Sequence, residues 1–406
     1  MGQVGIIGGG ASGIMAAIAA MRAGATVRLW EKNPVLGRKL LATGNGRCNL
    51  SNCDLDLAHF HAPDSEFVAA VLRRLDGKRT LEFFREIGVE TVADARGRYF
   101  PASNEATAVL ACLTGEMERL GAMVAISAEI VGIEAKGRCF LVRRRGSSEA
   151  VAALIIACGG RAGPGMGTQS GYALAQQLGH TVTELRPGLV PLMLCGSWFH
   201  KLQGVRWDMT LTVSRAGKRV LEITDEGLFT RYGLSGPLAL RSSRAIGEGD
   251  CEVTLSFMPE MNDAQAERLL AARQQRLSHR PVGDFLTGLL PAKLGRVIAA
   301  ECGLALEMPC GQLGTHLLAK LACSLTHWPV RVRGLCPFSE AQVTVGGVNL
   351  HEINPATMSS RLVPGLFFCG EVVDVDGDSG GYNLQWAWSS GYVAGTAAAA
   401  FVRGRS

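Results

Sequence analysis

Two cysteines separated by four residues, Cys48 and Cys53, lie in the segment GNGRCNLSNC (44–53), downstream of a glycine-rich N-terminus. A thiol pair can exchange electrons through a disulfide, but this chemistry needs a nearby base that holds one thiol as the thiolate. A histidine near the C-terminus would serve as that base, and the chain has no histidine after His351. We therefore expect the segment to be a glycine-rich loop rather than a redox-active pair.

The N-terminal glycines form a second chemical pattern, Gly8-x-Gly10-x-x-Gly13, with Glu31 farther along. In such a pattern the first glycine permits a tight turn, the second lets the backbone approach a pyrophosphate, and the third lets a helix pack on a strand. The start of that helix offers free N–H groups to the anion, and the acidic residue accepts hydrogen bonds from a ribose. The pattern predicts a dinucleotide-binding site.

Two later segments favour FAD over NAD as the dinucleotide. ALIIACGG (153–160) and GLFFCGE (365–371) are apolar runs that end in glycine, and they are similar to the nucleotide-proximal strands of two-dinucleotide-binding flavoproteins. No second glycine fingerprint follows in the middle of the chain. We therefore expect one tightly bound FAD and no separate Rossmann domain for a nicotinamide.

The loop around the first cysteine is expected to pass beside the flavin ring. Gly44 and Gly46 allow close approach of the backbone, because glycine has no side chain and accepts unusual backbone angles. Arg47 and Asn49 offer hydrogen-bonding groups to the polar edge of the ring. The loop is therefore a candidate part of the cofactor site.

A second glycine turn, DVDGDSGGYN (374–383), is expected to meet the flavin from another side. Its acidic spacing mimics part of a calcium loop, but the closing glutamate is missing, so we expect no metal. We expect the turn to deliver Gly380 and Gly381 to the ring. Tyr382 and Asn383 would then precede a helix whose N-terminus points at the pyrimidine carbonyl.

Strand and helix patterns alternate at both ends of the chain. A strand at 4–7, a helix at 12–23 and a strand at 26–31 form a βαβ unit. Further helices are expected at 66–88, 104–120 and 383–401. Between these parts, residues 191–257 alternate like β structure and residues 262–326 have a helical composition. The predicted fold is α/β, with a Rossmann-like FAD-binding domain split by an insertion.

Four motifs carry a resemblance to a known family: GRKLLATGNGRCNLSN (37–52), FTRYGLSGP (229–237), AQVTVGGV (341–348) and GDSGGYNLQWAWSSGYVAG (377–395). They resemble the YhiN/BaiN-type family of FAD-dependent oxidoreductases, and the resemblance runs from end to end. It implies an FAD-binding domain of residues 1–190 and 341–406, a β-barrel-like part of residues 191–258 and 329–340, and a helical part of residues 259–328.

The patterns and the resemblance together nominate the residues that hold FAD. They belong to the N-terminal βαβ unit, to the glycine loops and to the strand ends that face them. The expected set is Gly8, Gly10, Ala11, Ser12, Gly13, Glu31, Lys32, Arg38, Lys39, Gly44, Gly46, Arg47, Asn49, Val131, Ala157, Gly159, Gly370, Glu371, Gly381, Asn383 and Leu384.

The resemblance also implies a reaction, the reduction of a C=C bond conjugated with a carbonyl. Reduced flavin supplies a hydride from N5 to the far carbon, and the protein supplies a proton to the other carbon. Tyr382 and Cys48 are the expected proton donors, and NADH or NADPH is the expected transient electron donor. A small enone-like molecule is the expected substrate; the alternatives are a uridine of ribosomal RNA, reduced to dihydrouridine, and a flavin-binding module without catalysis.

The composition excludes several other classes of protein. The 12 cysteines include no C-x2-C pair, so they do not form a zinc framework, and scattered thiols are typical of a reducing compartment. The net charge of +5 is too weak to imply a polyanionic partner by itself. No leader pattern is visible, and the apolar run at 391–402 is too short to span a membrane. We expect a cytoplasmic protein that does not associate with membranes.

Overall fold

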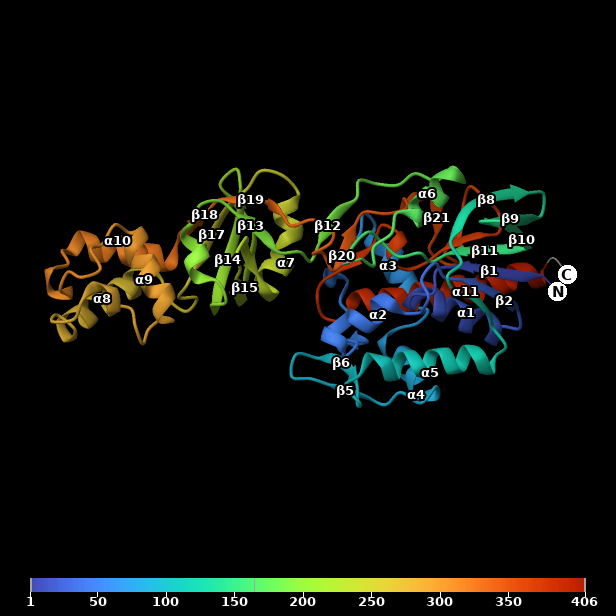
Figure 1. Cartoon of the computed structure of the whole chain (residues 1–406), viewed down its shortest axis with the longest axis horizontal. Helices are drawn as coiled ribbons and strands as arrows, with labels where there is room; N and C mark the ends of the chain where they lie inside the picture. Colours follow the sequence, from blue (N-terminus) through green and yellow to red (C-terminus); the bar gives the residue numbers. More distant parts are fainter. Residues whose placement is uncertain (1, 164, 405–406) are drawn as a thin grey trace. The chain divides into compact units, whose positions relative to one another are not determined.

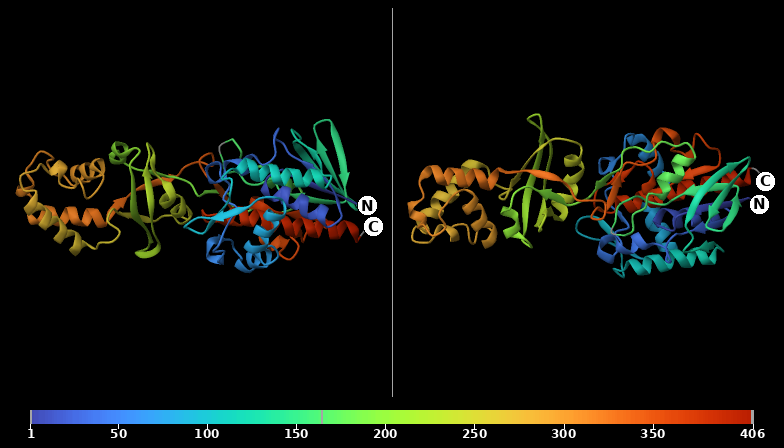
Figure 2. Two further views of the ribbon diagram at one scale, coloured as in Figure 1. Left: turned by 90° about the horizontal axis from the view of Figure 1, so that it is seen from below. Right: turned by 45° about the horizontal axis from the view of Figure 1, so that its top comes forward.

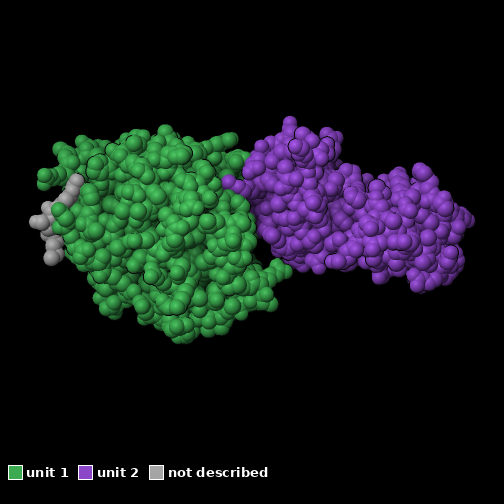
Figure 3. Space-filling view, turned by 180° about the vertical axis from the view of Figure 1, so that it is seen from behind, with its two compact units in different colours: residues 1–187, 342–406 green, residues 188–341 purple. Residues whose placement is uncertain are grey.

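The computed structural model describes residues 2–163 and 165–404 of the chain. It divides into two compact units, one of residues 1–187 and 342–406 and one of residues 188–341 (Figure 3). The first unit is thus made from both ends of the sequence, and the second is a continuous insertion. The further division of the insertion into a β part and a helical part stays a prediction.

A seven-stranded sheet forms the centre of the first unit, in the order β21-β22-β23-β11-β1-β2-β7 (Figure 1). The strands from β23 to β7 are parallel, which confirms the predicted α/β fold with a Rossmann-like sheet. Their bounds are β1 (Gln3–Ile7), β2 (Thr26–Trp30), β7 (Met123–Ala125), β11 (Ala153–Ile156), β21 (Ile353–Asn354), β22 (Ser359–Ser360) and β23 (Leu366–Phe368).

Two layers cover this sheet. Helices α1 (Ala11–Arg22) and α11 (Tyr382–Arg403) lie along one face, and a three-stranded antiparallel sheet lies along the other (Figures 1 and 2). The small sheet consists of β8 (Ile130–Lys136), β9 (Cys139–Arg144) and β10 (Ser147–Val151). Because both faces of the central sheet are covered, its parallel strands are almost continuously apolar.

Helices α1 and α11 approach each other more closely than ordinary side chains allow. A β-carbon on Gly391 would lie 2.5 Å from the carbonyl oxygen of Ser12, and one on Gly395 would lie 2.2 Å from that of Ala16. Since the two glycines and their two partners follow one another in the same direction, the helices run parallel. This contact joins the N-terminal βαβ unit to the last helix of the chain.

The predicted helix at 66–88 is wrong in one respect, because the structure has two helices there. Helix α3 (Ser65–Leu72) ends, and α4 (Gly77–Glu86) begins at Asp76, whose side chain accepts a hydrogen bond from the Arg79 N–H at 2.8 Å. The remaining elements outside the insertion are α2 (Arg38–Ala42), α5 (Ala106–Arg119), α6 (Ser170–Gln177), β3 (Ser51–Asn52), β4 (Phe60–His61), β5 (Thr91–Ala93), β6 (Arg98–Pro101), β12 (Arg186–Gly188), β20 (Val343–Val345) and β24 (Asp376–Gly377).

The second unit contains an antiparallel sheet in the order β18-β17-β14-β15-β16-β13-β19. Strands β18 and β19 form the two edges of this sheet, although only one residue separates them in the chain. The sheet must therefore curl until its edges approach each other. The bounds are β13 (Leu192–Leu194), β14 (Arg206–Arg215), β15 (Lys218–Phe229), β16 (Gly233–Ser235), β17 (Glu252–Ser256), β18 (Trp328–Val330) and β19 (Val332–Leu335).

Four helices accompany that sheet: α7 (Gly236–Gly247), α8 (Asp263–Arg276), α9 (Ala292–Glu301) and α10 (Thr315–Thr326). The expectation of β structure throughout 191–257 is wrong at α7, where Pro237 stands in the first turn and Leu238, Ser242 and Ile246 bury one face. Among the described residues, no helix has the length and apolar character that crossing a membrane requires.

A Gly395→Val substitution tests the helix contact. The added side chain would collide with the α1 backbone, so we expect the free energy of unfolding to fall by at least about 2 kcal/mol. Ala400→Val on the exposed side of the same helix is the control and should cost only about 0.5 kcal/mol of helix propensity. Denaturant unfolding of both variants measures the difference, and equal losses would contradict the close packing.

Candidate functional site

The glycine turn between β1 and α1 has the three properties that a pyrophosphate site needs. A β-carbon on Gly8 would lie 2.4 Å from the Ala157 oxygen, and one on Gly13 would lie 1.9 Å from the Gly8 oxygen. By contrast, no described residue comes within 4 Å of the β-carbon position of Gly10, the N-cap of α1. The turn is therefore packed tightly against β11 behind it and open in front of the helix, where Ala11 and Ser12 begin the first turn.

Glu31 lies directly after β2 and is buried. One of its carboxylate oxygens accepts the Gly9 N–H at 2.7 Å, and the other accepts the backbone and side-chain N–H groups of Asn33 at 2.8 and 2.6 Å. The carboxylate thus fixes the glycine turn. The Gly9-bonded oxygen keeps a lone pair for a ribose hydroxyl, because a carboxylate oxygen accepts up to two hydrogen bonds.

Three other predicted cofactor residues, Lys32, Arg38 and Val131, are exposed to solvent. The Arg38 guanidinium donates to the Asn33 side chain at 3.4 Å. Val131, on β8, is 56% exposed and follows Ala128, whose N–H bonds the Glu31 carbonyl at 2.8 Å. The role of Val131 in holding the cofactor stays a prediction.

The late strand β23 returns to the same place through a turn at Gly370, which has a φ of +77°. A β-carbon there would lie 2.3 Å from the Ser12 hydroxyl, so the turn touches the first turn of α1. The next residue, Glu371, forms an ion pair with Lys39 at 2.5 Å and accepts the Thr344 N–H at 2.8 Å. Lys39 and Glu371, which are 332 residues apart, therefore lie together beside the glycine turn.

The loop at 44–52 is held in an unusual conformation. Gly44, Asn45, Gly46 and Cys48 all have positive φ angles, of 58°, 55°, 84° and 62°. Such angles cost an ordinary residue about 1–2 kcal/mol, so the loop keeps its shape only because its surroundings hold it. The Arg47 guanidinium lies 4.5 Å from the centre of the Phe100 ring, which fixes this predicted cofactor residue by a cation–π contact.

The loop and the second glycine turn meet at Asn49 and Gly381. A β-carbon on Gly381, whose φ is +104°, would lie 2.4 Å from the Ser51 oxygen and 2.9 Å from the Asn49 side-chain oxygen. That oxygen is buried and has no hydrogen-bond partner among the described residues. A buried acceptor without a donor is costly, and an N–H group on the pyrimidine edge of a flavin would satisfy it. The residues present therefore fit FAD.

Helix α11 begins at Tyr382, one residue before the expected start at 383, so Tyr382 and Asn383 are its first two residues rather than part of the preceding turn. The Asn383 side chain accepts from the Gly377 N–H at 2.9 Å and donates to the Gly377 oxygen at 2.7 Å. It thus braces the glycine turn, and Leu384 follows it, partly buried. The helix start offers backbone N–H groups to a carbonyl oxygen.

A group of side chains that we did not predict lies at this helix start. The Asp378 carboxylate bonds Nδ1 of His59 at 3.0 Å and Nε2 of His61 at 2.9 Å, and the His59 ring stacks on Tyr382 with centroids 4.5 Å apart. Burial alone would raise the pKa of Asp378, but the hydrogen bonds from His61 and His59 hold that pKa below its usual value. An ionised Asp378 only accepts, so both imidazoles donate to it.

The two cysteines of the loop lie in different environments. Cys48 is fully buried, and burial raises the pKa of its thiol to about 12, while Cys53 is exposed; both are free thiols. A buried thiol with a raised pKa is a poor nucleophile and a poor proton donor at neutral pH. These environments do not suit dithiol chemistry, and they leave Cys48 as a packing residue of the loop.

Gly10→Val tests the open space in front of α1. The extended backbone of Gly10, with φ −83° and ψ −173°, accepts valine, and the β-carbon would meet no described atom beyond its chain neighbours, so the apoprotein should keep its unfolding midpoint. The added methyl groups occupy the pyrophosphate space, so purified protein should lose at least about 90% of its FAD absorbance. Gly115→Val, at another uncrowded glycine with ordinary φ, is the control. Normal FAD content in Gly10→Val would overturn this site.

Comparison with known proteins gives the family of the chain. The model of the family described as "HI0933-like protein Rossmann domain" matches residues 2–397. A 3-dehydro-bile acid delta(4,6)-reductase of Clostridium scindens is 37% identical over 98% of this chain and 99% of its own. A ribosomal RNA dihydrouridine synthase of Escherichia coli is 30% identical over 96% of both chains.

Among solved structures, 3-ketosteroid delta1-dehydrogenase of Sterolibacterium denitrificans superposes with a TM-score of 0.54. The match covers 98% of this chain and 100% of that one at 10% identity, and so shows a shared fold. The family model and the two relatives each cover nearly the whole length of the chain. The chain therefore belongs to the HI0933-like family and is an FAD-dependent oxidoreductase with a Rossmann domain.

Proposed function

We propose that the protein reduces a C=C bond conjugated with a carbonyl in a small enone-like molecule, with NADH or NADPH as the reductant. Support comes from the names of its relatives: a 3-dehydro-bile acid delta(4,6)-reductase and a ribosomal RNA dihydrouridine synthase. Both names describe saturation of a ring C=C bond that is conjugated with a carbonyl. The bile acid relative has the higher identity, 37% against 30%, and this favours a small molecule.

One observation in the structure carries the proposal, the placement of two parallel helix starts. Gly391 packs on Ser12, near the start of α1, so the nine residues of α11 that precede Gly391 extend this helix beyond that start by about 14 Å. The first helix start faces the open space at Gly10. The second, at Gly381, meets the buried acceptor of Asn49. One extended cofactor with a pyrophosphate and a polar ring edge would use both.

Bound FAD supplies the hydride, and the protein must supply the proton. We place the proton source at Tyr382 and the adjoining His59, because His59 is partly exposed and is bonded to the ionised Asp378. The stacked imidazole brings a titratable group with access to solvent beside the phenol. Cys48, the other expected donor, is disfavoured by its burial and by its raised pKa.

The second candidate function is the reduction of a uridine in ribosomal RNA to dihydrouridine. The E. coli relative and a Haemophilus influenzae relative of the same name, each 30% identical over 96% of this chain, favour it. The bond to be reduced has the same chemistry, so the flavin end of the site would serve both substrates. The difference lies in how the rest of the substrate is bound.

Anaerobic reduction and reoxidation separate the two. We expect NADH or NADPH to bleach the bound FAD, and a 3-oxo-4,6-diene steroid to restore its absorbance while being saturated. Reoxidation only by ribosomal RNA that lacks dihydrouridine would support the second function. Failure of both substrates to reoxidise the reduced enzyme would refute both, and failure of both nicotinamides to reduce it would refute the assigned reductant.

Tyr382→Phe tests the proton source. Removing the hydroxyl should leave FAD content and flavin reduction by NAD(P)H unchanged, but it should slow reoxidation by the enone about 100-fold or more. Tyr392→Phe on the same helix and Cys48→Ala should reoxidise at the normal rate. Normal reoxidation in Tyr382→Phe, or a loss in Cys48→Ala with intact FAD content, would move the proton source elsewhere.

A further inference from the structure

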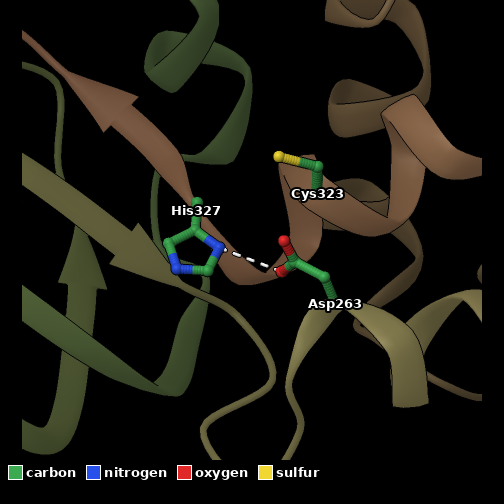
Figure 4. Close-up of side chains that lie close together, drawn as sticks. All are labelled: Asp263, Cys323 and His327. Carbon is green, nitrogen blue, oxygen red and sulfur yellow. Dashed lines mark hydrogen bonds and ion pairs between the residues drawn. The ribbon is translucent and has the colours of Figure 1, made fainter.

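Three potential metal ligands of different chemistry come together on the second unit, which contains none of the residues assigned to FAD. Asp263 is the first residue of α8, Cys323 lies in the last turn of α10, and His327 follows that helix directly (Figure 4). All three side chains are exposed. Cys323 and His327 are four residues apart and therefore share one face of the helix end.

The distances suit a single metal ion. One ligand atom from each residue lies within 4.8 Å of the other two, and the Asp263 carboxylate oxygen is 3.0 Å from Nδ1 of His327. Around zinc, with bonds of about 2.0–2.3 Å, neighbouring tetrahedral ligands are roughly 3.3–3.7 Å apart. Small side-chain rotations would therefore give tetrahedral spacing without moving the backbone.

The backbone positions of the three residues are already fixed. Asn262 caps α8 through a reciprocal pair of hydrogen bonds with Gln265, which holds the backbone of Asp263 in place between them. The His327 N–H bonds the Cys323 oxygen at 2.7 Å, and the next residue, Trp328, is buried against Phe257 with ring centroids 5.9 Å apart. The Thr326 hydroxyl also donates to the Asp263 carboxylate, so α10 and α8 are joined at this point.

We propose that Asp263, Cys323 and His327 form a zinc site with three protein ligands and a water in the fourth position. Thiolate, imidazole and carboxylate together are a typical ligand set for Zn²⁺. On binding, the Cys323 thiol releases its proton to solvent, and the His327 imidazole stays neutral, with its proton transferred through solvent from Nδ1 to Nε2 so that Nδ1 can bind the metal. One thiolate and one carboxylate then balance the two positive charges of the ion.

Cobalt substitution is the direct test, made on the full-length FAD-loaded protein. Co²⁺ should give a thiolate-to-metal charge-transfer band at a stoichiometry of one, and Zn²⁺ should displace it. Cys323→Ser should abolish the band, and His327→Gln should weaken Co²⁺ binding at least about 10-fold. His316→Ala, an exposed histidine on the same helix, is the matched control and should bind normally. Absence of the band in the wild-type protein, or its persistence in Cys323→Ser, would overturn the site.

A second measurement needs no variant and so does not depend on their folding. Zn²⁺ should slow the alkylation of Cys323 at least about 10-fold, as followed by peptide mass spectrometry, because the metal-bound thiolate is protected. Cys53, which is also exposed, serves as the internal control and should react at an unchanged rate. Equal rates at Cys323 with and without Zn²⁺ would overturn the proposal.

Discussion

The close contact between α1 and α11 is the constraint on which the rest of the first unit depends. Gly391 and Gly395 let the last helix rest on the backbone of the first, at Ser12 and Ala16. Because the helices run parallel, this contact fixes how far the start of α11 lies from the start of α1. The insertion of residues 188–341 interrupts the chain between these helices, so the contact also closes the unit again.

The same contact explains how the strained loop of the candidate site keeps its shape. The 44–52 loop holds Asn45 and Cys48 at positive φ, and Gly381 presses against its end at Ser51. The Ser51 hydroxyl donates to the Gln385 side chain on α11 at 2.6 Å, in a fully buried position. The contacts with helix α11 thus offset the free-energy cost of the strained loop conformation.

Local sequence signals were sufficient for the elements around the glycine turn. The strand, glycine turn and helix at the N-terminus and the closing helix are contiguous patterns, and the structure contains each of them. Their role in holding the nucleotide stays a prediction. Helix α7 was missed because its apolar period is short and lies between alternating strands. The break after α3 was missed because Asp76 acts as a cap only once the chain has turned.

Groups that depend on distant pairing could not be found in this way. His59 and His61 are two residues apart, directly before β4 and at its end, yet their partner Asp378 is brought to them only by the pairing of β4 with β24. Cys323 and His327 have the spacing of helical metal ligands, but Asp263 joins them through the packing of α8 on α10. In both cases two residues of the group are close in the sequence and could be noticed there. The third, a carboxylate, is brought to them only by tertiary structure and so could not be predicted.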